Sequence, residues 1–546
     1  MKSNAKIEFG DFQTPLALAR EICGLLQRQN LVPDVVLEPT CGMGAFLVSA
    51  AEAFPEALLR GWDINQEYIE QSRTKLALTG AGPRASVRCR DFFAHDWESE
   101  LQQWPGRLLI LGNLPWVTNS AVATINGSNL PAKENFLGLR GLAARTGKSN
   151  FDISEWMLIR LLRAVHGREA AIAMLCKTAT SRKVLRYAWQ NDGRIRQASL
   201  HRIDAATHFG ASVDACLLLV RTGHAGAMEA DVFDSLSTMK PAGRIGLAGQ
   251  DLVADIRSYR ELQQLEGLCP FRWRSGVKHD CADVMELRPV GNGTVENKLG
   301  ERVELESDYL YPLLKCSDLA NGRMTPQRLI LVTQRAMGGD TSGLVRLAPK
   351  TWRYLQSHSA KFAARKSSIY KGRAPFSLFG IGEYAFAPWK VAVSGLHLPA
   401  LFQVVGPFGA KPVFLDDTCN YLAFEDEASA RLVADVLNSA PCQQFLQSLI
   451  FSGSKRPITV ELLQRLNLNA IAEKAGCGRP WQNLNRVNYK SAATVPQFEL
   501  AMESAKPARC AHGAKSIPVN YGEARRPRKK TAKSTTGQDS CTNKSR

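Results

Sequence analysis

The sequence predicts an α/β fold: a doubly wound, mostly parallel sheet, followed by a C-terminal region of different architecture. Short apolar runs alternate with helical patterns over residues 35–222. A polar residue follows several of these runs at the carboxyl end, where open α/β sheets bind ligands. After about residue 235 the strand patterns shorten, and glycine, aromatic and basic residues are interleaved. The change in pattern predicts a second domain of mixed α+β structure.

The charge of the chain indicates a polyanionic partner. At 546 residues it has the length of two or three domains, and its 45% hydrophobic and 22% charged content is ordinary. Its formal net charge of +18 is not. Residues 504–546 hold eleven Lys or Arg against two Asp or Glu, which is half of the excess. The other half belongs to the part predicted to fold.

The cysteines predict neither a disulfide framework nor a metal site. There are thirteen, with no Cys-x-x-Cys pair and no Cys/His cluster at zinc spacing. We expect reduced thiols in a cytoplasmic protein. The first residues lack the apolar segment of a signal peptide, and runs such as 215–220 are too short to span a bilayer, so no membrane association is expected.

A helical pattern begins near residue 15. Thr14 is a favourable N-cap residue, and Pro15 suits the first helical position. The apolar residues of this pattern continue to Leu26. Alone, the segment indicates only where a helix starts.

The first strand, 35–37, leads into a glycine turn before the next helix. Gly42 and Gly44 allow the backbone to approach a ligand closely and to direct amide donors at it. Glu38, at the strand end, can accept from an ammonium or hydroxyl group. With only two glycines, the turn is not the dinucleotide fingerprint.

The next two strands also end in acidic residues. Strand 58–62 ends in Asp63, about twenty residues past the glycine turn, where a ribose diol is held in doubly wound folds. Strand 85–88 leads to Asp91 and Phe92, an acceptor and an apolar wall that suit an adenine ring.

The fourth strand, 109–111, delivers Gly112-Asn113-Leu114-Pro115-Trp116 to the same edge. An Asn side-chain oxygen beside a backbone carbonyl offers two acceptors to one amino group. The adjacent Trp offers a stacking face, so the turn suits the exocyclic amine of a flipped nucleobase. The alternative is an ordinary strand-ending turn that contains Asn and Pro.

Taken together, these motifs resemble the γ-class DNA adenine N6-methyltransferases of type II restriction–modification systems. The match covers roughly residues 8–222 and follows the family's motif order: 12–15, 38–46, Asp63, 91–92, 113–116 and 209–215. One residue departs from the family pattern, because Leu114 stands where the family usually has a second Pro.

The resemblance implies three regions: a seven-stranded Rossmann-like methyltransferase domain over 1–235, a target-recognition domain over 236–475, and a linker with a basic, disordered tail over 476–546. The implied cofactor is S-adenosylmethionine. Its expected binding residues are Thr14, Glu38, Gly42 and Gly44 for the methionine end, Asp63 for the ribose, and Asp91 and Phe92 for the adenine.

The expected catalytic residues are Asn113, Leu114, Pro115, Trp116 and Phe209. Asn113 and the Leu114 carbonyl would accept from the target amine, and Trp116 and Phe209 would sandwich the base. No strong base is required, because the amine becomes acidic only as it is alkylated. Catalysis then comes from positioning and electrostatics.

Four further segments were considered for function. Residues 141–149 resemble a phosphate-binding loop but carry one residue too many between the glycines, so a DNA or lid role is favoured. A helix-like stretch, 351–373, combines basic and aromatic residues that can grip phosphates and stack bases. Residues 451–459 form a basic turn that resembles the closing segment of these enzymes. Asp283 with Glu296-Asn297-Lys298 is a poor match to a nuclease cluster.

The predicted partner is double-stranded DNA, with a separate restriction endonuclease or phage-defence partner as a further possibility. Two other functions stay open on the sequence: methylation of RNA or of a protein glutamine, and a DNA-binding homologue inactivated through Leu114. The large C-terminal region and the motif at 12–15 favour DNA methylation over RNA or protein methylation.

Overall fold

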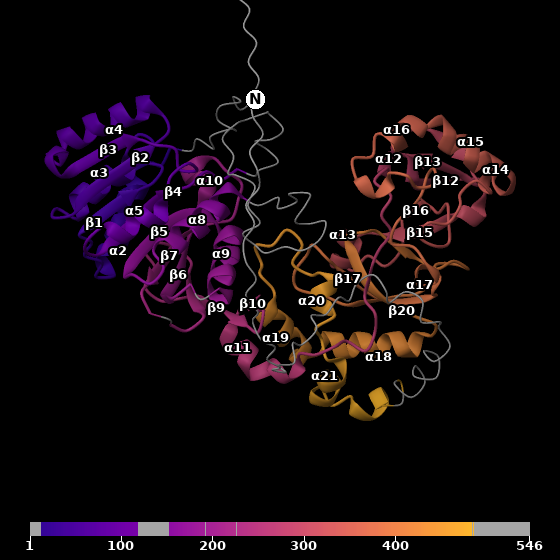
Figure 1. Ribbon diagram of the computed structural model, residues 1–546. Helices are drawn as coiled ribbons and strands as arrows, with labels where there is room; N and C mark the ends of the chain where they lie inside the picture. The colour runs from indigo at the N-terminus through magenta and orange to yellow at the C-terminus, as the bar shows by residue number, and fades with distance from the viewer. Residues whose placement is uncertain (1–12, 118–151, 192, 225, 483, 485–546) are drawn as a thin grey trace, which may run out of the picture. The chain divides into compact units, whose positions relative to one another are not determined.

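The computed structural model describes residues 13–117, 152–191, 193–224, 226–482 and 484 (Figure 1). All of them lie in one compact unit, Met1–Val487. Phe12, the loop-like segment 141–149 and the tail predicted to be disordered fall outside the described residues.

The largest sheet has ten strands in the order β10-β9-β8-β6-β7-β5-β4-β1-β2-β3. Strands β1, β2, β3, β4 and β5 are neighbours in parallel, and β7 pairs antiparallel with both β5 and β6. This confirms the predicted α/β class. The strands are β1 (Val35–Glu38), β2 (Leu58–Asp63), β3 (Ala85–Cys89), β4 (Leu108–Asn113), β5 (Ala170–Lys177), β6 (Ile195–Ile203), β7 (Ala215–Thr222), β8 (Glu229–Phe233), β9 (Gly243–Ala248) and β10 (Asp251–Val253).

The sheet continues past the domain boundary that the sequence places at residue 235. Strands β1–β7 are the seven that the sequence predicts, and β8–β10 extend the sheet to Val253. Strands β9 and β10 are short antiparallel partners and only partly buried. They therefore lack the continuous apolar run that marks a buried parallel strand.

Helices cover both faces of this sheet, because alternate residues of its strands point to opposite faces. Val35 and Leu37 belong to the core on one side, and Val36 to the core on the other. The first core includes α5 (Trp97–Gln103), α8 (Ile153–Ala164) and α9 (Thr178–Gln190). The second includes α2 (Leu16–Arg28), α3 (Ala45–Ala53), α4 (Gln66–Leu78) and α10 (Ala205–Phe209).

The first of these helices begins one residue later than predicted. Helix α2 starts at Leu16, and its N-cap is Pro15 rather than Thr14. The Pro15 carbonyl accepts from the Ala19 amide at 3.1 Å, and no side chain caps the helix. The proline ring, which holds φ near its helical value, therefore precedes the helix and does not open it.

The C-terminal region contains two further sheets, as predicted for a mixed α+β domain. A four-stranded sheet has the order β11-β20-β17-β18, and a six-stranded sheet the order β14-β13-β12-β16-β15-β19. Their strands are β11 (Arg274–Ser275), β12 (Glu286–Gly291), β13 (Thr294–Asn297), β14 (Arg302–Glu304), β15 (Leu310–Leu314), β16 (Arg328–Leu331), β17 (Trp389–Ser394), β18 (Gln403–Val405), β19 (Phe414–Leu415) and β20 (Cys419–Phe424).

Short helices complete both C-terminal cores. They are α11 (Ile256–Leu262), α12 (Ala282–Met285), α13 (Cys316–Ala320), α14 (Leu344–Leu347), α15 (Pro349–Ser357), α16 (Ser359–Ala363), α17 (Glu383–Phe386), α18 (Glu427–Asn438), α19 (Ala440–Leu449), α20 (Val460–Leu463) and α21 (Leu468–Lys474). Four 3₁₀ turns are described: η1 (Gly82–Arg84), η2 (Gln263–Leu265), η3 (Ser307–Tyr309) and η4 (Ser368–Tyr370). The stretch 351–373 is thus broken into α15, α16 and η4 instead of forming one helix.

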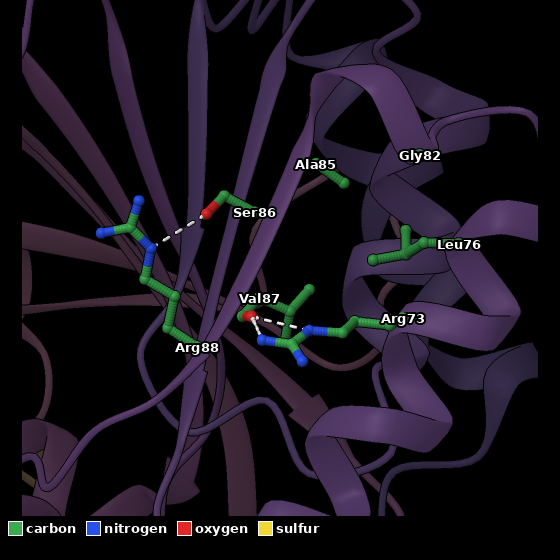
Figure 2. A pocket seen from close by; sticks show the side chains of 7 residues that line it. All are labelled: Arg73, Leu76, Gly82, Ala85, Ser86, Val87 and Arg88. Atoms are coloured by element: carbon green, nitrogen blue, oxygen red, sulfur yellow. Dashed lines mark hydrogen bonds between the residues drawn. The ribbon is translucent and has the colours of Figure 1, made fainter.

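Strand β3 is an edge of the ten-stranded sheet, and an arginine covers part of it. The Arg73 guanidinium donates two hydrogen bonds to the Val87 carbonyl, at 3.0 and 2.6 Å (Figure 2). A pocket of about 330 Å³ lies here, lined by residues of α4, η1 and β3. Covering an edge strand protects it from pairing with another chain. The pocket lies beside the edge strand β3, and its lining does not include Glu38, Asp63 or Asn113.

None of the helices in the described ranges is long and apolar enough to cross a membrane. The eleven cysteines that the structure describes are free thiols.

A buried lysine makes the stability of the C-terminal region depend on pH. Lys390 in β17 is 1% exposed, and its ammonium donates to the Ala387 carbonyl at 2.7 Å. Burial lowers the pKa of Lys390 to about 7. The unfolded chain retains this proton up to the ordinary pKa of 10.5. Between these values the unfolded state binds more protons, so stability increases as pH rises.

We expect Lys390→Met to raise the free energy of unfolding at pH 7 by about 1–3 kcal/mol, because a buried charge is replaced by an apolar chain of similar length. The variant should also show a flatter dependence on pH between 7 and 10. Urea unfolding at several pH values measures both effects, with the exposed Lys240→Met as the control. Equal slopes for Lys390→Met and the parent protein would contradict the assignment.

Candidate active site

Three parallel strands bring predicted polar residues to one edge of the sheet. Glu38, Asp63 and Asn113 are the last residues of β1, β2 and β4. Glu38 pairs in register with Gly61 on β2, two residues before Asp63. The Thr40 hydroxyl, just past β1, reaches the Asn113 carbonyl at 3.5 Å. The predicted gathering of polar residues at the carboxyl ends of the parallel strands is therefore present.

The glycine turn contacts Asp63 directly. The Gly42 amide donates to one Asp63 carboxylate oxygen at 2.8 Å, and the Asn65 amide donates to the other at 2.9 Å. Gly42 and Gly44 have φ values of +48° and +79°, the left-handed region that favours glycine. A Cβ on Gly44 would lie 3.3 Å from the Ser72 Cα, and closer still to its side chain. Both glycines are thus required by backbone geometry and packing.

Glu38 is a buried carboxyl beneath this turn. It is 3% exposed and accepts from the Leu47 amide, in α3, at 3.2 Å. Burial raises the pKa of Glu38 well above its usual range, and the nearby Asp63 charge raises it further. A cationic ligand at this position would offset that desolvation, because an opposite charge favours the ionised form. The site is therefore suited to an ammonium group.

Sequence reasoning missed Gln13, the residue before Thr14. Its side-chain oxygen accepts from the Met43 amide at 3.1 Å, and it lies where a Cβ on Gly42 would project. Thr14 is half-buried beside it. The segment at 13–15 therefore lies against the glycine turn. The family resemblance could have pointed to Gln13, because its first motif, 12–15, includes this residue. No local sequence pattern predicts the contact between Gln13 and the glycine turn.

The structure separates the predicted roles of Asp91 and Phe92. Asp91 is exposed and caps its own turn by accepting from the Phe93 amide at 2.8 Å. Phe92 is 6% exposed and packs on Trp97 with ring centroids 4.6 Å apart. Most of the Phe92 surface is therefore used by the core, whereas Phe93 is only half-buried.

The turn after β4 is held at several atoms. The Trp116 indole donates to the Leu175 carbonyl at 3.4 Å, and the Trp116 carbonyl accepts from the Lys177 ammonium at 2.9 Å. The Val117 carbonyl accepts from the Ile153 amide at 2.9 Å. No described residue donates a hydrogen bond to the Leu114 carbonyl. That carbonyl is the predicted second acceptor for a target amine.

The predicted sandwich of Trp116 and Phe209 is not formed in this arrangement. The two ring centroids are 5.1 Å apart, and the rings meet edge to face at 67°. A planar base between two rings needs them about 7 Å apart, twice the carbon contact distance. In this arrangement the pair offers one apolar wall and no slot.

Lys177 and Asp152 are further residues of this region that sequence reasoning did not select. Lys177 ends β5, and its ammonium contacts an Asp152 carboxylate oxygen at 2.5 Å. Asp152 is 6% exposed and caps α8 by accepting from the Ser154 amide at 3.2 Å. The only hint of Asp152 in the sequence is an acidic residue directly before a helical pattern. That arrangement is typical of any N-cap and does not by itself indicate a functional residue.

In the stretch 351–373, three of the four aromatic residues pack in the core: Trp352, Tyr354 and Phe362. The Tyr354 hydroxyl, which is buried, donates to the Val284 carbonyl at 2.9 Å, and Trp352 packs on Phe376. Arg365 donates to backbone carbonyls and stacks on Tyr370. The predicted base stacking by these aromatics is therefore not supported. The residues of this stretch that do present exposed charge are Arg353, Lys361, Lys366, Lys371 and Arg373.

The residues matched to a nuclease cluster do not assemble one. Glu296 pairs with Arg288 and Arg302, whereas Lys298 pairs with Glu286. Within the described ranges, no group of three or more His, Cys, Asp or Glu side chains is placed to hold a metal ion.

Comparison with known proteins identifies the family. No known family model matches the chain. The chain is 42% identical over 472 residues to the type II methyltransferase M.NspV of Nostoc sp. (strain ATCC 29411 / PCC 7524), covering 86% of this chain and 98% of that protein. The chain belongs to the type II methyltransferases.

A solved structure has a fold similar to that of this methyltransferase. The type IIL restriction–modification enzyme MmeI, solved in complex with DNA, has a TM-score of 0.55 and 12% identity, covering 85% of this chain and 69% of that one. At this identity the likeness concerns fold alone. It extends across both the ten-stranded sheet and the C-terminal sheets.

The burial of Leu114 predicts how this methyltransferase responds to a proline at that position. The Leu114 side chain is 1% exposed and belongs to the core that includes Phe92 and Met157. We expect Leu114→Pro to destabilise the protein by about 1–3 kcal/mol, because buried methyl groups are lost. Leu114→Met, which conserves volume, should cost less than about 1.5 kcal/mol. Urea unfolding of the three proteins checks this, and a fully stable Leu114→Pro would show that the side chain is not packed as described.

Proposed function

We propose that this type II methyltransferase transfers a methyl group from S-adenosylmethionine to the exocyclic N6 of adenine in double-stranded DNA, at a specific site and on a flipped base. The observation that carries the proposal is the end of β4, where Asn113 is followed directly by Leu114, whose carbonyl no described residue engages. The proposal includes a role in restriction–modification or phage defence with a separate partner.

The residues at the sheet edge fit the proposed cofactor. The buried Glu38 carboxyl suits the ammonium of an amino acid. The turn through Gly42 and Gly44 needs glycine at both positions, because a Cβ there would clash with the Gln13 or the Ser72 side chain. Asp63 lies within hydrogen-bond distance of that turn, where a ribose diol can be held. When bound, S-adenosylmethionine supplies an electrophilic methyl group on a sulfonium. Thr14, Asp91 and Phe92 remain proposed contacts.

The chain's own contribution to the reaction is positioning. Asn113 and the Leu114 carbonyl accept the two N–H groups of the target amine, which turns the nitrogen lone pair away from the ring. Pro115 biases Leu114 towards extended geometry, so that its carbonyl stays directed at the amine. Trp116 with Phe209 supplies an apolar wall for the base. Acceptors held in place before the reaction act through preorganised electrostatics.

The C-terminal region is the proposed DNA-recognition domain. Its support is the exposed charge of residues such as Lys361, Lys366 and Lys371, and a similar fold that was solved in complex with DNA. Exposed cations bind phosphates without reading sequence. Recognition of a specific site is therefore assigned to this region as a whole and not to individual residues.

We expect Asp63→Ala to weaken S-adenosylmethionine binding by about 10- to 100-fold, because a charged acceptor is lost. DNA affinity should stay within about twofold, since the residue is assigned to the cofactor site. Calorimetry with the cofactor and a DNA-binding assay measure the two effects. Asp34→Ala is the matched control, because Asp34 precedes the opposite end of β1 and pairs with Arg107. An unchanged cofactor affinity in folded Asp63→Ala would overturn the assignment.

Transfer of a tritiated methyl group to duplex DNA, RNA and protein, followed by nucleoside analysis, tests the proposal itself. We expect label in DNA as N6-methyladenine. Asn113→Ala should lower the single-turnover rate by at least about 100-fold, with DNA binding retained, because one acceptor is removed. Asn113→Asp keeps an acceptor oxygen and should retain more activity. Label in RNA, in protein or on another base would replace this function, and binding without transfer would favour a catalytically idle homologue.

A further inference from the structure

Strand β5 holds Trp116, the last residue of the Asn113–Trp116 turn. Asn113 at the end of β4 is in register with Leu175 on β5, so β5 continues for two residues beside the turn. Two residues at this end of β5 form hydrogen bonds with Trp116. The Leu175 carbonyl accepts from its indole, and the Lys177 ammonium donates to its carbonyl.

The Lys177 ammonium is itself oriented by a buried acid. Its second contact is the Asp152 carboxylate, which is 6% exposed. Lysine has three donors and no acceptor, so one ammonium can serve both oxygens. A buried carboxylate without this partner would carry a large desolvation penalty. The contact between Asp152 and Lys177 therefore restrains the ammonium at the Trp116 carbonyl.

A similar ion pair lies close by without touching the turn. Lys183 in α9 contacts the Glu155 carboxylate at 2.9 Å, and Glu155 is 4% exposed in the first turn of α8. Both pairs join a buried acid at the start of α8 to a lysine, which is the last residue of β5 in one pair and lies in α9 in the other. Of these two lysines, only Lys177 donates to a carbonyl of the Asn113–Trp116 turn. The difference between the two pairs is therefore contact with the turn.

We propose that Lys177, oriented by Asp152, is a positioning residue that sets the conformation of the Asn113–Trp116 turn and thereby the direction of its two acceptors. The inference rests on the proposed function for its effect on catalysis. Lys177 touches neither acceptor, so it acts through the backbone between Leu114 and Trp116. A displacement of about 1 Å in a catalytic group can cost 100-fold in rate.

The kinetic test compares Lys177→Met, Asp152→Asn, the double variant and Lys183→Met in the full-length protein. Lys177→Met should lower the single-turnover methylation rate by about 10- to 100-fold, with cofactor and DNA dissociation constants changed less than about threefold. Asp152→Asn keeps the helix cap and should lower the rate less. The double variant should be no slower than Lys177→Met, because the two residues act as a unit. Lys183→Met should stay within about twofold of the parent rate.

A second measurement does not depend on activity. The indole N–H of Trp116, assigned in a spectrum of ¹⁵N-tryptophan protein by its loss in Trp116→Phe, should exchange with solvent at least about tenfold faster in Lys177→Met. In Lys183→Met it should be unchanged. If Lys177→Met does not fold, Asp152→Asn serves in the same comparison, with a smaller expected change.

The outcomes separate the inference from the proposed function. If indole exchange is faster in Lys177→Met but the parent protein methylates nothing, the proposed function is refuted and the positioning role is retained. Unchanged exchange and an unchanged rate in folded Lys177→Met would overturn the inference while methylation by the parent protein stood. Equal effects of Lys177→Met and Lys183→Met would assign both pairs to general stability and also overturn it.

Discussion

The buried strand β4 is the constraint on which the site depends. It lies between β1 and β5, parallel to both, and five of its six residues are buried. The apolar side chains of β4 alternate between the two cores, and its pairing with β1 and β5 fixes its register on both sides. Its last residue, Asn113, is therefore delivered to one place at the sheet edge. Every other element of the site is arranged around that fixed end.

The turn after β4 combines apolar anchoring with polar restraint. Leu114 and Trp116 are buried among core residues, which fixes two side chains of the turn. Lys177 and the Ile153 amide engage the carbonyls on its far side. The rigidity that a second proline would provide locally is thus supplied by packing and by hydrogen bonds from distant segments. This accounts for how Leu114 can occupy the position without leaving the turn unrestrained.

The glycine turn after β1 depends on a different kind of constraint. Gly42 and Gly44 adopt positive φ, and the Gly42 amide is bound to Asp63. Glu38 is buried beneath the turn, where its charge is costly without a partner. A cation bound beside Glu38 would favour its ionised form, because an opposite charge offsets the desolvation of the carboxylate.

The C-terminal region shows the limit of composition as a guide. Basic and aromatic residues alternate along 351–373, a pattern typical of nucleic-acid binding. In three dimensions Trp352 and Tyr354 face the core, whereas most of the cations of the stretch are exposed. Composition could not distinguish these directions, because the stretch is broken into two helices and a 3₁₀ turn.

The sequence by itself determined the strand ends and what they carry: Glu38, Asp63 and Asn113 stand where the apolar runs and turn residues place them. Such features are local, since periodicity and turn chemistry are written in consecutive residues. Only the tertiary structure decided that Phe92 belongs to the core, that the rings of Trp116 and Phe209 are in contact, and that Lys177 donates a hydrogen bond to the Trp116 carbonyl. These contacts join residues up to 93 positions apart, as for the two rings, and they depend on strand order and register. No local pattern encodes that order, because it is set by how whole strands and helices bury their apolar faces against one another.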